Sequence, residues 1–225
     1  MNPPTVPPGS AAKAKLVSGL YAVADGAWLE EKNFAAAVAA AIDGGARLIQ
    51  YRDKAADRDA SERTAGLLAA LCRERGVPLI LNDDVDLAAR VGANGVHLGR
   101  DDADLGQARA TLGPRAIIGV SCYNELERAR AAQGAGADYV AFGRFFPSRT
   151  KPQAVPASLE LLRAARSELR IPIVAIGGIT PDNGKSLIDA GADALAVIEG
   201  VFNQPDIRAA AARYANLFRQ PAESP

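Results

Sequence analysis

Carboxylates follow two short apolar runs of the chain and are the residues best suited to chemistry. The run 79–81 leads to Asp83 and Asp84, and the run 95–98 leads to Asp102. If both runs are parallel strands, their carboxyl ends emerge on one face, so Asp83 and Asp102 can meet although nineteen positions separate them. Two carboxylates at an open site suit Mg²⁺, which keeps several waters and takes other ligands from a phosphorylated substrate. The alternative is that Asp83 and Asp84 only begin a helix, where acidic side chains interact favourably with the helix dipole.

Cations follow another apolar run and predict a diphosphate site. In residues 50–54, strand alternation places Gln50, Arg52 and Lys54 on one side. Arg can grip a diphosphate through two parallel hydrogen bonds, and Lys adds a point charge. The alternative is a solvated strand end in which these cations pair with Asp53. The carboxylate pair expected nearby favours a site that holds a metal ion and a diphosphate together.

The composition limits the class of protein. The chain has 225 residues, 48% of them apolar, and a formal net charge of zero. That length suits one α/β barrel domain, and the lack of a Lys/Arg block argues against a nucleic-acid partner. No apolar run approaches the length of a transmembrane helix, so no membrane partner is expected. Cys72 and Cys122 have neither metal-ligand spacing nor a disulfide framework, which indicates a reduced, cytoplasmic compartment.

Short apolar runs alternate with longer amphipathic runs along the chain, as is typical of βα units. The expected strands are 19–24, 47–51, 77–81, 95–98, 115–120, 138–142, 171–176 and 194–198. Eight strands alternating with helices predict an α/β fold with a parallel sheet closed into a TIM (β/α)8 barrel. This single domain is expected over residues 16–220. Residues 1–15 contain four prolines and little that could pack, so they are expected to form a disordered tail.

A repeat of Gly-Ala pairs supports closure of the barrel. The pairs begin at Gly45, Gly92, Gly136 and Gly191, each just before an even-numbered strand, where glycine can end a helix and let the chain turn. The spacings are 47, 44 and 55 residues, so the last interval carries extra residues. These fall in the loop 143–152, and a long loop at the catalytic end of a barrel is more often functional than idle.

Loops after the last two strands predict a second anion site. Gly177 and Gly178 follow the strand 171–176, and Glu199 follows the strand 194–198. In many barrels these two loops hold a phosphate group against backbone N–H groups. The protein is therefore expected to bind two phosphate-bearing groups, one with a metal ion and one without.

Six motifs occur in order at the ends of the expected strands, and together they are far more specific than any one of them. They are QYRDK at 50–54, LND at 81–83, GVHLG at 95–99 with Asp102, GVS at 119–121, FPSRTK at 146–151 and IGGIT at 176–180. With these motifs the chain resembles the thiamine phosphate synthase family from Leu20 to about Phe218. The resemblance implies a Mg²⁺-dependent transferase that joins hydroxymethylpyrimidine diphosphate to a thiazole phosphate and releases pyrophosphate. It also implies a dissociative substitution, in which the diphosphate leaves before the thiazole nitrogen attacks.

The resemblance further implies a role for each matching residue. The metal ligands would be Asp83 and Asp102. The catalytic residues would be Arg52, Lys54, Ser121 and Lys151. The thiazole phosphate would lie against Ser148, Thr150, Gly178 and the backbone of Ile198 and Glu199. The full substrate-binding set would be Gln50, Tyr51, Arg52, Asp53, Lys54, Asn82, Ser121, Ser148, Arg149, Thr150, Lys151, Gly178, Ile198 and Glu199.

Four residues depart from the usual pattern of the family. Ser148 stands in place of a common Thr, Arg100 in place of Gln, Tyr123 in place of His, and Glu199 in place of a phosphate-binding Ser. Of these, Glu199 puts the local detail of phosphate binding in question. His97, the only histidine, lies in an apolar strand and is expected to be a hydrogen-bonded core residue rather than an acid–base group.

Two other classes of function fit the same fold. An isomerase like thiazole tautomerase would share the barrel and the thiazole phosphate site, but it would need neither the diphosphate cations nor the metal pair. Its catalytic histidine also has no counterpart here, because Tyr123 stands in that position. A barrel that only binds a phosphorylated ligand would not need the leaving-group residues. The partners expected in each case are small molecules, and the sequence leaves open whether the protein is a homo-oligomer.

Overall fold

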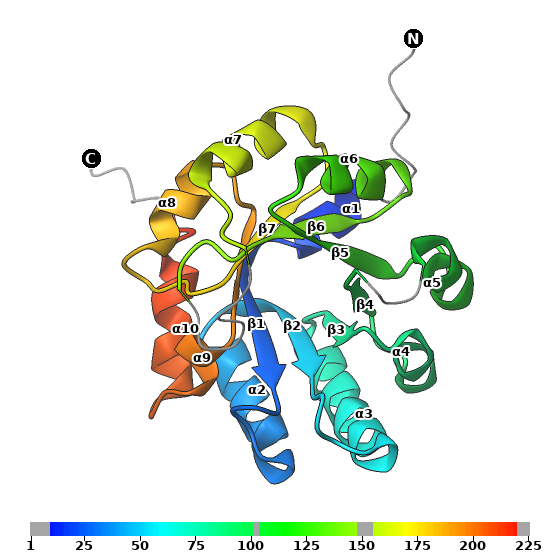
Figure 1. The fold of residues 1–225 in the computed structure, drawn as a ribbon. Helices are drawn as coiled ribbons and strands as arrows, with labels where there is room; N and C mark the ends of the chain where they lie inside the picture. The colour runs from blue at the N-terminus through cyan, green and yellow to red at the C-terminus, as the bar shows by residue number, and fades with distance from the viewer. Residues whose placement is uncertain (1–9, 101–103, 148–154, 220–225) are drawn as a thin grey trace.

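The eight expected strands form a closed barrel in the computed structural model, which describes residues 10–100, 104–147 and 155–219 (Figure 1). The strands are β1 (Gly19–Asp25), β2 (Ala46–Arg52), β3 (Leu79–Asn82), β4 (Gly95–Leu98), β5 (Ile117–Tyr123), β6 (Tyr139–Phe142), β7 (Ile173–Ile176) and β8 (Ala194–Val197). Each strand pairs in parallel with the next, and β8 pairs with β1 to close the ring. This confirms the predicted TIM (β/α)8 fold. All eight carboxyl ends therefore lie at one end of the barrel, where such folds place their active sites.

Helices surround the barrel. They are α1 (Ser10–Leu16), η1 (Glu31–Asn33), α2 (Phe34–Asp43), α3 (Arg58–Arg75), α4 (Val85–Val91), α5 (Leu105–Leu112), α6 (Leu126–Gly134), α7 (Leu159–Glu168), α8 (Gly184–Asp189), α9 (Glu199–Phe202) and α10 (Ile207–Asn216). The glycines of the repeat all have positive φ, as the predicted turns into the even strands require: Gly45, Gly92, Gly136 and Gly191. Within the described residues, no helix combines the length and the apolar character that a membrane span requires.

Strand alternation divides the buried side chains into two layers. The layer inside the barrel consists of Val17, Tyr21, Val23, Leu48, Ile80, Ile117, Tyr139, Ala141, Val174, Ala194 and Ala196. A larger layer, which includes Ile49 and Phe34, fills the space between the strands and the helices. Along β2, Leu48 and Gln50 therefore face the interior, whereas Ile49 and Tyr51 face the helices.

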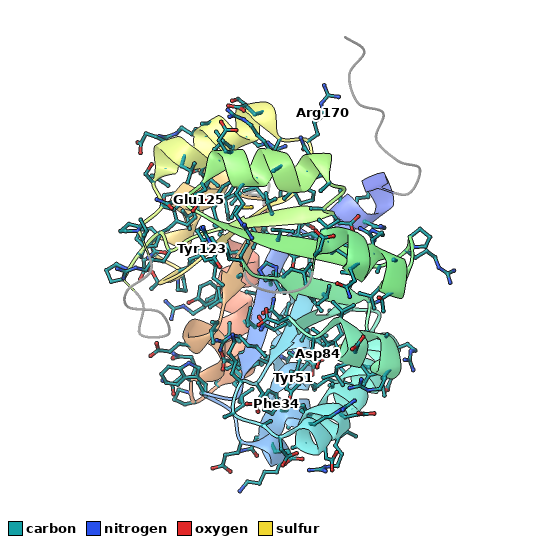
Figure 2. The ribbon with its side chains drawn as sticks, turned by 45° about the vertical axis from the view of Figure 1, so that its right-hand side comes forward. Phe34, Tyr51, Asp84, Tyr123, Glu125 and Arg170 are labelled. Atoms are coloured by element: carbon teal, nitrogen blue, oxygen red, sulfur yellow. The ribbon has the colours of Figure 1, made fainter. Side chains whose placement is uncertain are left out.

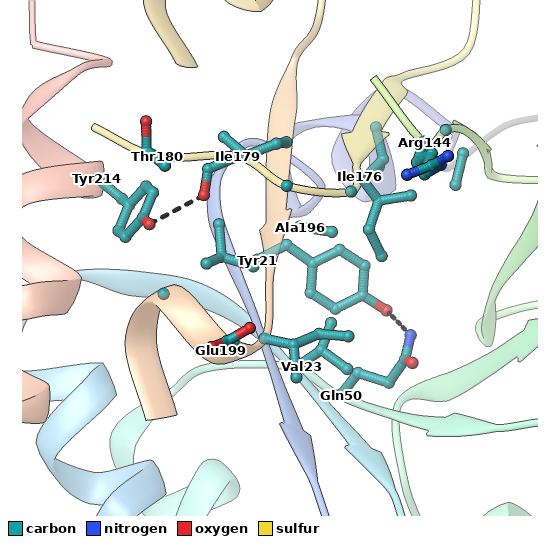
Figure 3. Close-up of a pocket in the computed structure, with 18 of the residues that line it drawn as sticks. Tyr21, Val23, Gln50, Arg144, Ile176, Ile179, Thr180, Ala196, Glu199 and Tyr214 are labelled. Carbon is teal, nitrogen blue, oxygen red and sulfur yellow. Dashed lines mark hydrogen bonds between the residues drawn. The ribbon is translucent and has the colours of Figure 1, made fainter. Parts of the chain in front are cut away.

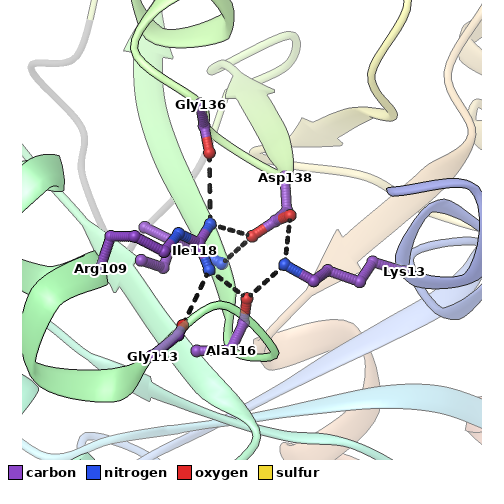
Figure 4. Close-up of polar contacts among 7 residues, drawn as sticks. All are labelled: Lys13, Arg109, Gly113, Ala116, Ile118, Gly136 and Asp138. Carbon is purple, nitrogen blue, oxygen red and sulfur yellow. Dashed lines mark hydrogen bonds and ion pairs between the residues drawn. The ribbon is translucent and has the colours of Figure 1, made fainter. Parts of the chain in front are cut away.

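The helix α1 closes the amino end of the barrel. Lys13 Nζ donates to a carboxylate oxygen of Asp138 and to the backbone carbonyl just before β5, both at 3.0 Å (Figure 4). Arg109 pairs with the other carboxylate oxygen of Asp138, and Val17 is fully buried among the interior side chains. This corrects the expected disordered tail over residues 10–15. A lysine with a buried carboxylate partner and an apolar residue that fills the barrel end together order this segment.

We expect Lys13→Met to lower the free energy of unfolding by about 1–2 kcal/mol, because Asp138 would lose one of its two cations and keep Arg109. The turnover should not change, since Lys13 lies at the end of the barrel opposite the carboxyl ends of the strands. Denaturant unfolding and steady-state assays measure the two quantities. Lys15→Met, at an exposed position of the same helix, is the control and should change neither. An equal loss of stability in both variants would contradict the role of Lys13.

Candidate active site

A cavity of about 610 Å³ opens at the carboxyl ends of the strands (Figure 3). Its floor is formed by interior side chains such as Tyr21 and His97, and its rim by the loops after β6, β7 and β8. The predicted site residues that line it are Gln50, Arg52, Asn82, Ser121, Gly178, Ile198 and Glu199. The structure thus brings together residues from the ends of β2, β3, β5, β7 and β8.

Arg52 is held at the cavity by a carboxylate that sequence reasoning missed. Asp25 ends β1 in register with Arg52 at the end of β2, and the two side chains form an ion pair. Asp25 is only 1% exposed and also accepts a hydrogen bond from the N–H of Ala27 at 2.9 Å. A buried, doubly hydrogen-bonded carboxylate fixes the direction of the guanidinium. The available signal was an acidic residue at the end of the first apolar run.

Asp83 and Lys54 meet beside the cavity. Lys54 Nζ lies 3.4 Å from a carboxylate oxygen of Asp83. Asp83 has φ +64°, a left-handed conformation that Asp tolerates better than most residues, and its N–H donates to the carbonyl of His97 at 2.9 Å. The next residue, Asp84, begins α4 by accepting a hydrogen bond from the N–H of Leu87 at 2.7 Å. The helix-start interpretation therefore describes Asp84, whereas Asp83 is directed to Lys54.

Tyr51 and Asp53 lie away from the cavity. Tyr51 points to the helices, where its ring meets Phe34 edge-to-face with 5.2 Å between centroids, and burial raises the pKa of its hydroxyl (Figure 2). Asp53 accepts hydrogen bonds from the N–H groups of Ala55 and Ala56, at 3.0 and 3.1 Å. The sequence predicts both as substrate-binding residues, but the structure uses Tyr51 for packing and Asp53 for a turn.

A chain of hydrogen bonds crosses the floor of the cavity. Gln50 Nε2 donates to Tyr21 Oη at 2.7 Å, and Tyr21 Oη lies 2.9 Å from Tyr139 Oη. His97 Nδ1 lies 2.9 Å from Tyr139 Oη, and His97 Nε2 lies 2.8 Å from Ser121 Oγ. His97 is therefore hydrogen-bonded through both ring nitrogens, as predicted. It also lines the cavity, which the sequence did not indicate.

The loop after β7 packs closely against the loop after β6. Gly177 and Gly178 have φ of +104° and +65°, and a Cβ on Gly178 would lie only 2.3 Å from the carbonyl oxygen of Pro147. The N–H of Phe146 donates to the Gly177 carbonyl at 3.0 Å, and Asn183 Nδ2 donates to the Gly178 carbonyl at 3.1 Å. Only glycine fits at Gly178, so the cavity meets bare backbone there.

The loop after β8 lies beside these glycines. A Cβ on Gly200 would lie 2.1 Å from the hydroxyl oxygen of Tyr214, and Tyr214 Oη donates to the carbonyl of Ile179 at 3.0 Å (Figure 3). Burial raises the pKa of Tyr214 to about 12, so the phenol stays a neutral donor. These contacts place the start of α9, with Ile198 and Glu199, next to the β7 loop. The two loops predicted to bind a phosphate therefore adjoin one another.

Two of the departures from the family pattern contact each other at the rim of the cavity. The guanidinium carbon of Arg100 lies 5.0 Å from the centroid of the Tyr123 ring, and that of Arg128 lies 5.9 Å from it. Arg100 also pairs with Glu125. Tyr123 thus lines the cavity with a ring that contacts two guanidinium groups. Nothing in the spacing of these residues along the chain predicts that they meet.

Five predicted site residues lie outside the described residues: Asp102, Ser148, Arg149, Thr150 and Lys151. Their roles stay predictions. Over residues 10–100, 104–147 and 155–219, no group of three His, Cys, Asp or Glu side chains is arranged to hold a metal ion. Asp83 is therefore the predicted metal ligand whose surroundings the structure describes.

The parallel barrel, with cationic strand ends and glycine loops around one cavity, defines a class of (β/α)8 enzymes that act on phosphorylated small molecules. The chain belongs to the thiamine monophosphate synthase family, which it matches over residues 20–201. It is 56% identical over 202 residues to a thiamine-phosphate synthase of Nitrosococcus oceani, covering 90% of this chain and 93% of that protein. A second such relative, from Nitrosospira multiformis, is 51% identical over 216 residues, covering 96% of this chain and 92% of that protein. The structure of a thiamine phosphate pyrophosphorylase from Pyrococcus furiosus matches with a TM-score of 0.81 and 35% identity, covering 92% of this chain and 96% of that one.

Proposed function

We propose that the protein joins hydroxymethylpyrimidine diphosphate to a thiazole phosphate, forming thiamine phosphate and pyrophosphate. Family membership supports this transferase reaction. The observation that carries the proposal is the gathering of Arg52, Lys54 and Asp83 at adjoining strand ends, across one cavity from the glycine loops after β7 and β8. Such a site suits one substrate with a diphosphate and another with a single phosphate.

The residues at the end of β3 fit a magnesium ion. Asp83 supplies a hard oxygen ligand, and its side chain is 30% exposed, which leaves room for waters and phosphate oxygens. Asp102 follows β4, the strand that pairs with β3, and would be the second carboxylate ligand. When bound, Mg²⁺ would neutralise part of the charge on the diphosphate.

The chain's own residues would act by position and charge rather than by acid–base catalysis. The bond between the pyrimidine methylene carbon and the diphosphate oxygen breaks, both electrons stay on the oxygen, and the carbon then bonds to the thiazole nitrogen. Arg52, oriented by Asp25, and Lys54 would stabilise the charge that grows on the leaving group, together with Lys151. The floor of the cavity would hold the pyrimidine in line for attack.

The two alternative functions do not require Arg52 and Lys54 at this position. An isomerase acting on a thiazole phosphate has no leaving diphosphate for Arg52 and Lys54 to stabilise. A barrel that only binds a phosphate would not need a guanidinium aligned by a buried carboxylate. The substrates of the proposed reaction are small molecules, and we expect neither a nucleic-acid nor a membrane partner.

Pyrophosphate release tests the proposed function. It should be measured with each substrate alone and with both, with and without Mg²⁺, and the organic product should be identified by mass spectrometry. We expect release and thiamine phosphate only when both substrates and the metal are present. Rearrangement of the thiazole phosphate without the pyrimidine would instead identify an isomerase. Binding of both substrates without turnover would identify a non-catalytic barrel, and either result would overturn the proposal.

Replacing Glu199 tests where the single phosphate binds. At about 7 Å and an effective dielectric near 20, a carboxylate and each unit of phosphate charge repel by roughly 2 kcal/mol. We therefore expect Glu199→Ala to leave the affinity for the thiazole phosphate unchanged or slightly higher, because the side chain would point away and the phosphate would contact backbone N–H groups. Glu199→Pro removes an N–H at the start of α9 and should weaken binding. If titration calorimetry shows a sharp loss in a folded Glu199→Ala variant, the carboxylate binds the ligand directly.

A further inference from the structure

The hydrogen-bond chain under the cavity is made of buried, neutral groups. Tyr21 is 1% exposed, Tyr139 is fully buried, and Gln50 is 5% exposed. Burial raises the pKa of both phenols far above the ordinary value, so each keeps its hydrogen and has one to donate. A buried hydroxyl hydrogen without an acceptor is costly, so both hydrogens must be placed within the chain.

The N–H donor of Gln50 determines which group donates and which accepts in each bond of this hydrogen-bond chain. Because Gln50 Nε2 donates to Tyr21, the hydrogen of Tyr21 is left to donate to Tyr139. The hydrogen of Tyr139 then goes to His97 Nδ1. A neutral imidazole that accepts at Nδ1 carries its proton on Nε2, and this N–H donates to Ser121 Oγ.

The direction of the hydrogen bonds decides whether Gln50 and Ser121, at the two ends of the hydrogen-bond chain, act as donors or acceptors toward a ligand. One of the two hydrogens on Gln50 Nε2 is donated to Tyr21, which fixes the orientation of the amide and leaves Oε1 as an acceptor on a side chain that lines the cavity. Ser121 accepts from His97, so its own hydroxyl hydrogen can be donated to the cavity. Reversing either end requires all four hydrogen bonds to reverse together.

We propose that Tyr21, Tyr139 and His97 are positioning residues that fix Gln50 as an acceptor and Ser121 as a donor toward the pyrimidine ring. The inference rests on the proposed function for the identity of the ligand. The pattern matches a ring that offers an amino group to Gln50 and an unprotonated ring nitrogen to Ser121. It opposes a ring that offers a carbonyl oxygen to Gln50 or a ring N–H to Ser121. Linking the two ends therefore gives a discrimination that neither end would give alone.

Packing holds the rings of this chain in place. The ring of His97 stacks on that of Tyr139 with 5.5 Å between centroids and 20° between planes, and Tyr21 meets Tyr139 edge-on at 6.0 Å. A Cβ on Gly119 would lie 1.9 Å from Tyr139 Cζ, so the glycine of the GVS motif makes room for this ring. The motif therefore supplies Ser121 and also leaves the space that the ring of Tyr139 occupies.

The position of the proton on the His97 ring tests the proposed direction of the hydrogen bonds. His97 is the only histidine, so an untagged protein labelled with ¹⁵N-histidine gives ring-nitrogen signals from this residue alone. We expect Nδ1 to be unprotonated and Nε2 to carry the proton, and a proton on Nδ1 would overturn the proposal. Tyr139→Phe should shift both signals. Tyr214→Phe removes a buried phenol that bonds Ile179 instead and should leave them unchanged. Signals unaltered in Tyr139→Phe would also overturn it.

Ligand selectivity tests whether Gln50 acts as an acceptor and Ser121 as a donor toward the pyrimidine ring. Calorimetry should compare the aminopyrimidine diphosphate with an analogue that carries a carbonyl in place of the amino group. We expect the wild type to prefer the amino compound by at least about 100-fold and Tyr139→Phe by about tenfold or less. The affinity for inorganic pyrophosphate with Mg²⁺ should be equal in both proteins. Undiminished preference in a folded Tyr139→Phe variant contradicts the proposal.

Failure of the proposed function would give a different result. If the pyrimidine diphosphate is not a ligand of the protein, the wild type would bind neither pyrimidine compound. If the barrel binds it without turnover, the comparison of the two compounds still applies. In both cases the ring-nitrogen signals of His97 would still decide the direction of the hydrogen-bond chain. Should Tyr139→Phe fail to fold, the wild-type signals decide the question by themselves.

Discussion

Replacement of Asp83 by Asn should lower kcat by roughly 10²–10³-fold, because it removes a charged ligand of the ion that would stabilise the departing diphosphate. The fold should persist, since Asn also tolerates the left-handed conformation found at Asp83, with φ +64°. The ion pair with Lys54 is partly exposed, so its loss should change the free energy of unfolding by less than about 1 kcal/mol. Steady-state assays over a range of Mg²⁺ concentrations, with denaturant unfolding, measure both effects.

The neighbouring carboxylate provides the matched control. Asp84 accepts a hydrogen bond from the N–H of Leu87 at the start of α4, so Asp84→Ala should cost about 1 kcal/mol of stability. Its kcat should stay near that of the wild type. A variant that replaces both Asp83 and Asp102 by Asn should be little worse than either single variant, because the two would share one ion. Additive losses, or a kcat loss at Asp84 instead of Asp83, would contradict the shared site.

Periodicity was sufficient to predict the barrel but not which side chains of a motif reach the cavity. Apolar runs and repeated glycines are local features, and they specify strands and turns wherever the chain later packs. In the QYRDK motif, alternation alone sends Gln50 and Arg52 inward and Tyr51 outward, as the structure shows. The resemblance to the family implies substrate binding for the whole motif, and for Tyr51 this role stays a prediction, because its ring packs against Phe34.

Partners that meet through strand register could not be read from the sequence. Tyr21 and Tyr139 are 118 positions apart, and each has the pattern of an ordinary buried aromatic residue in a strand. Closure of the barrel is what brings their hydroxyl groups within 2.9 Å. The same holds for Lys13, whose contact with Asp138, 125 positions away, orders a segment that resembles a tail by composition.

Removal of Arg52 should have two large effects at once. Arg52→Ala should lower kcat by roughly 10²–10³-fold, because a cation at the leaving diphosphate is lost. It should also lower the free energy of unfolding by about 3–5 kcal/mol, since Asp25 would remain buried without its partner. Arg52→Lys should regain only part of the activity, because an ammonium group cannot reproduce the forked contact of a guanidinium.

A second substitution separates the two effects of Arg52→Ala. In Arg52→Ala combined with Asp25→Asn, no unpaired charge remains buried, so the stability should return toward that of the wild type while kcat stays low. Asp25→Asn alone keeps the guanidinium but orients it less firmly, and we expect a loss of about tenfold in kcat/KM for the pyrimidine substrate. Denaturant unfolding and steady-state kinetics on all four proteins complete the cycle. If kcat recovers together with stability in the double variant, Arg52 serves only to neutralise Asp25, and its assignment to the leaving group is wrong.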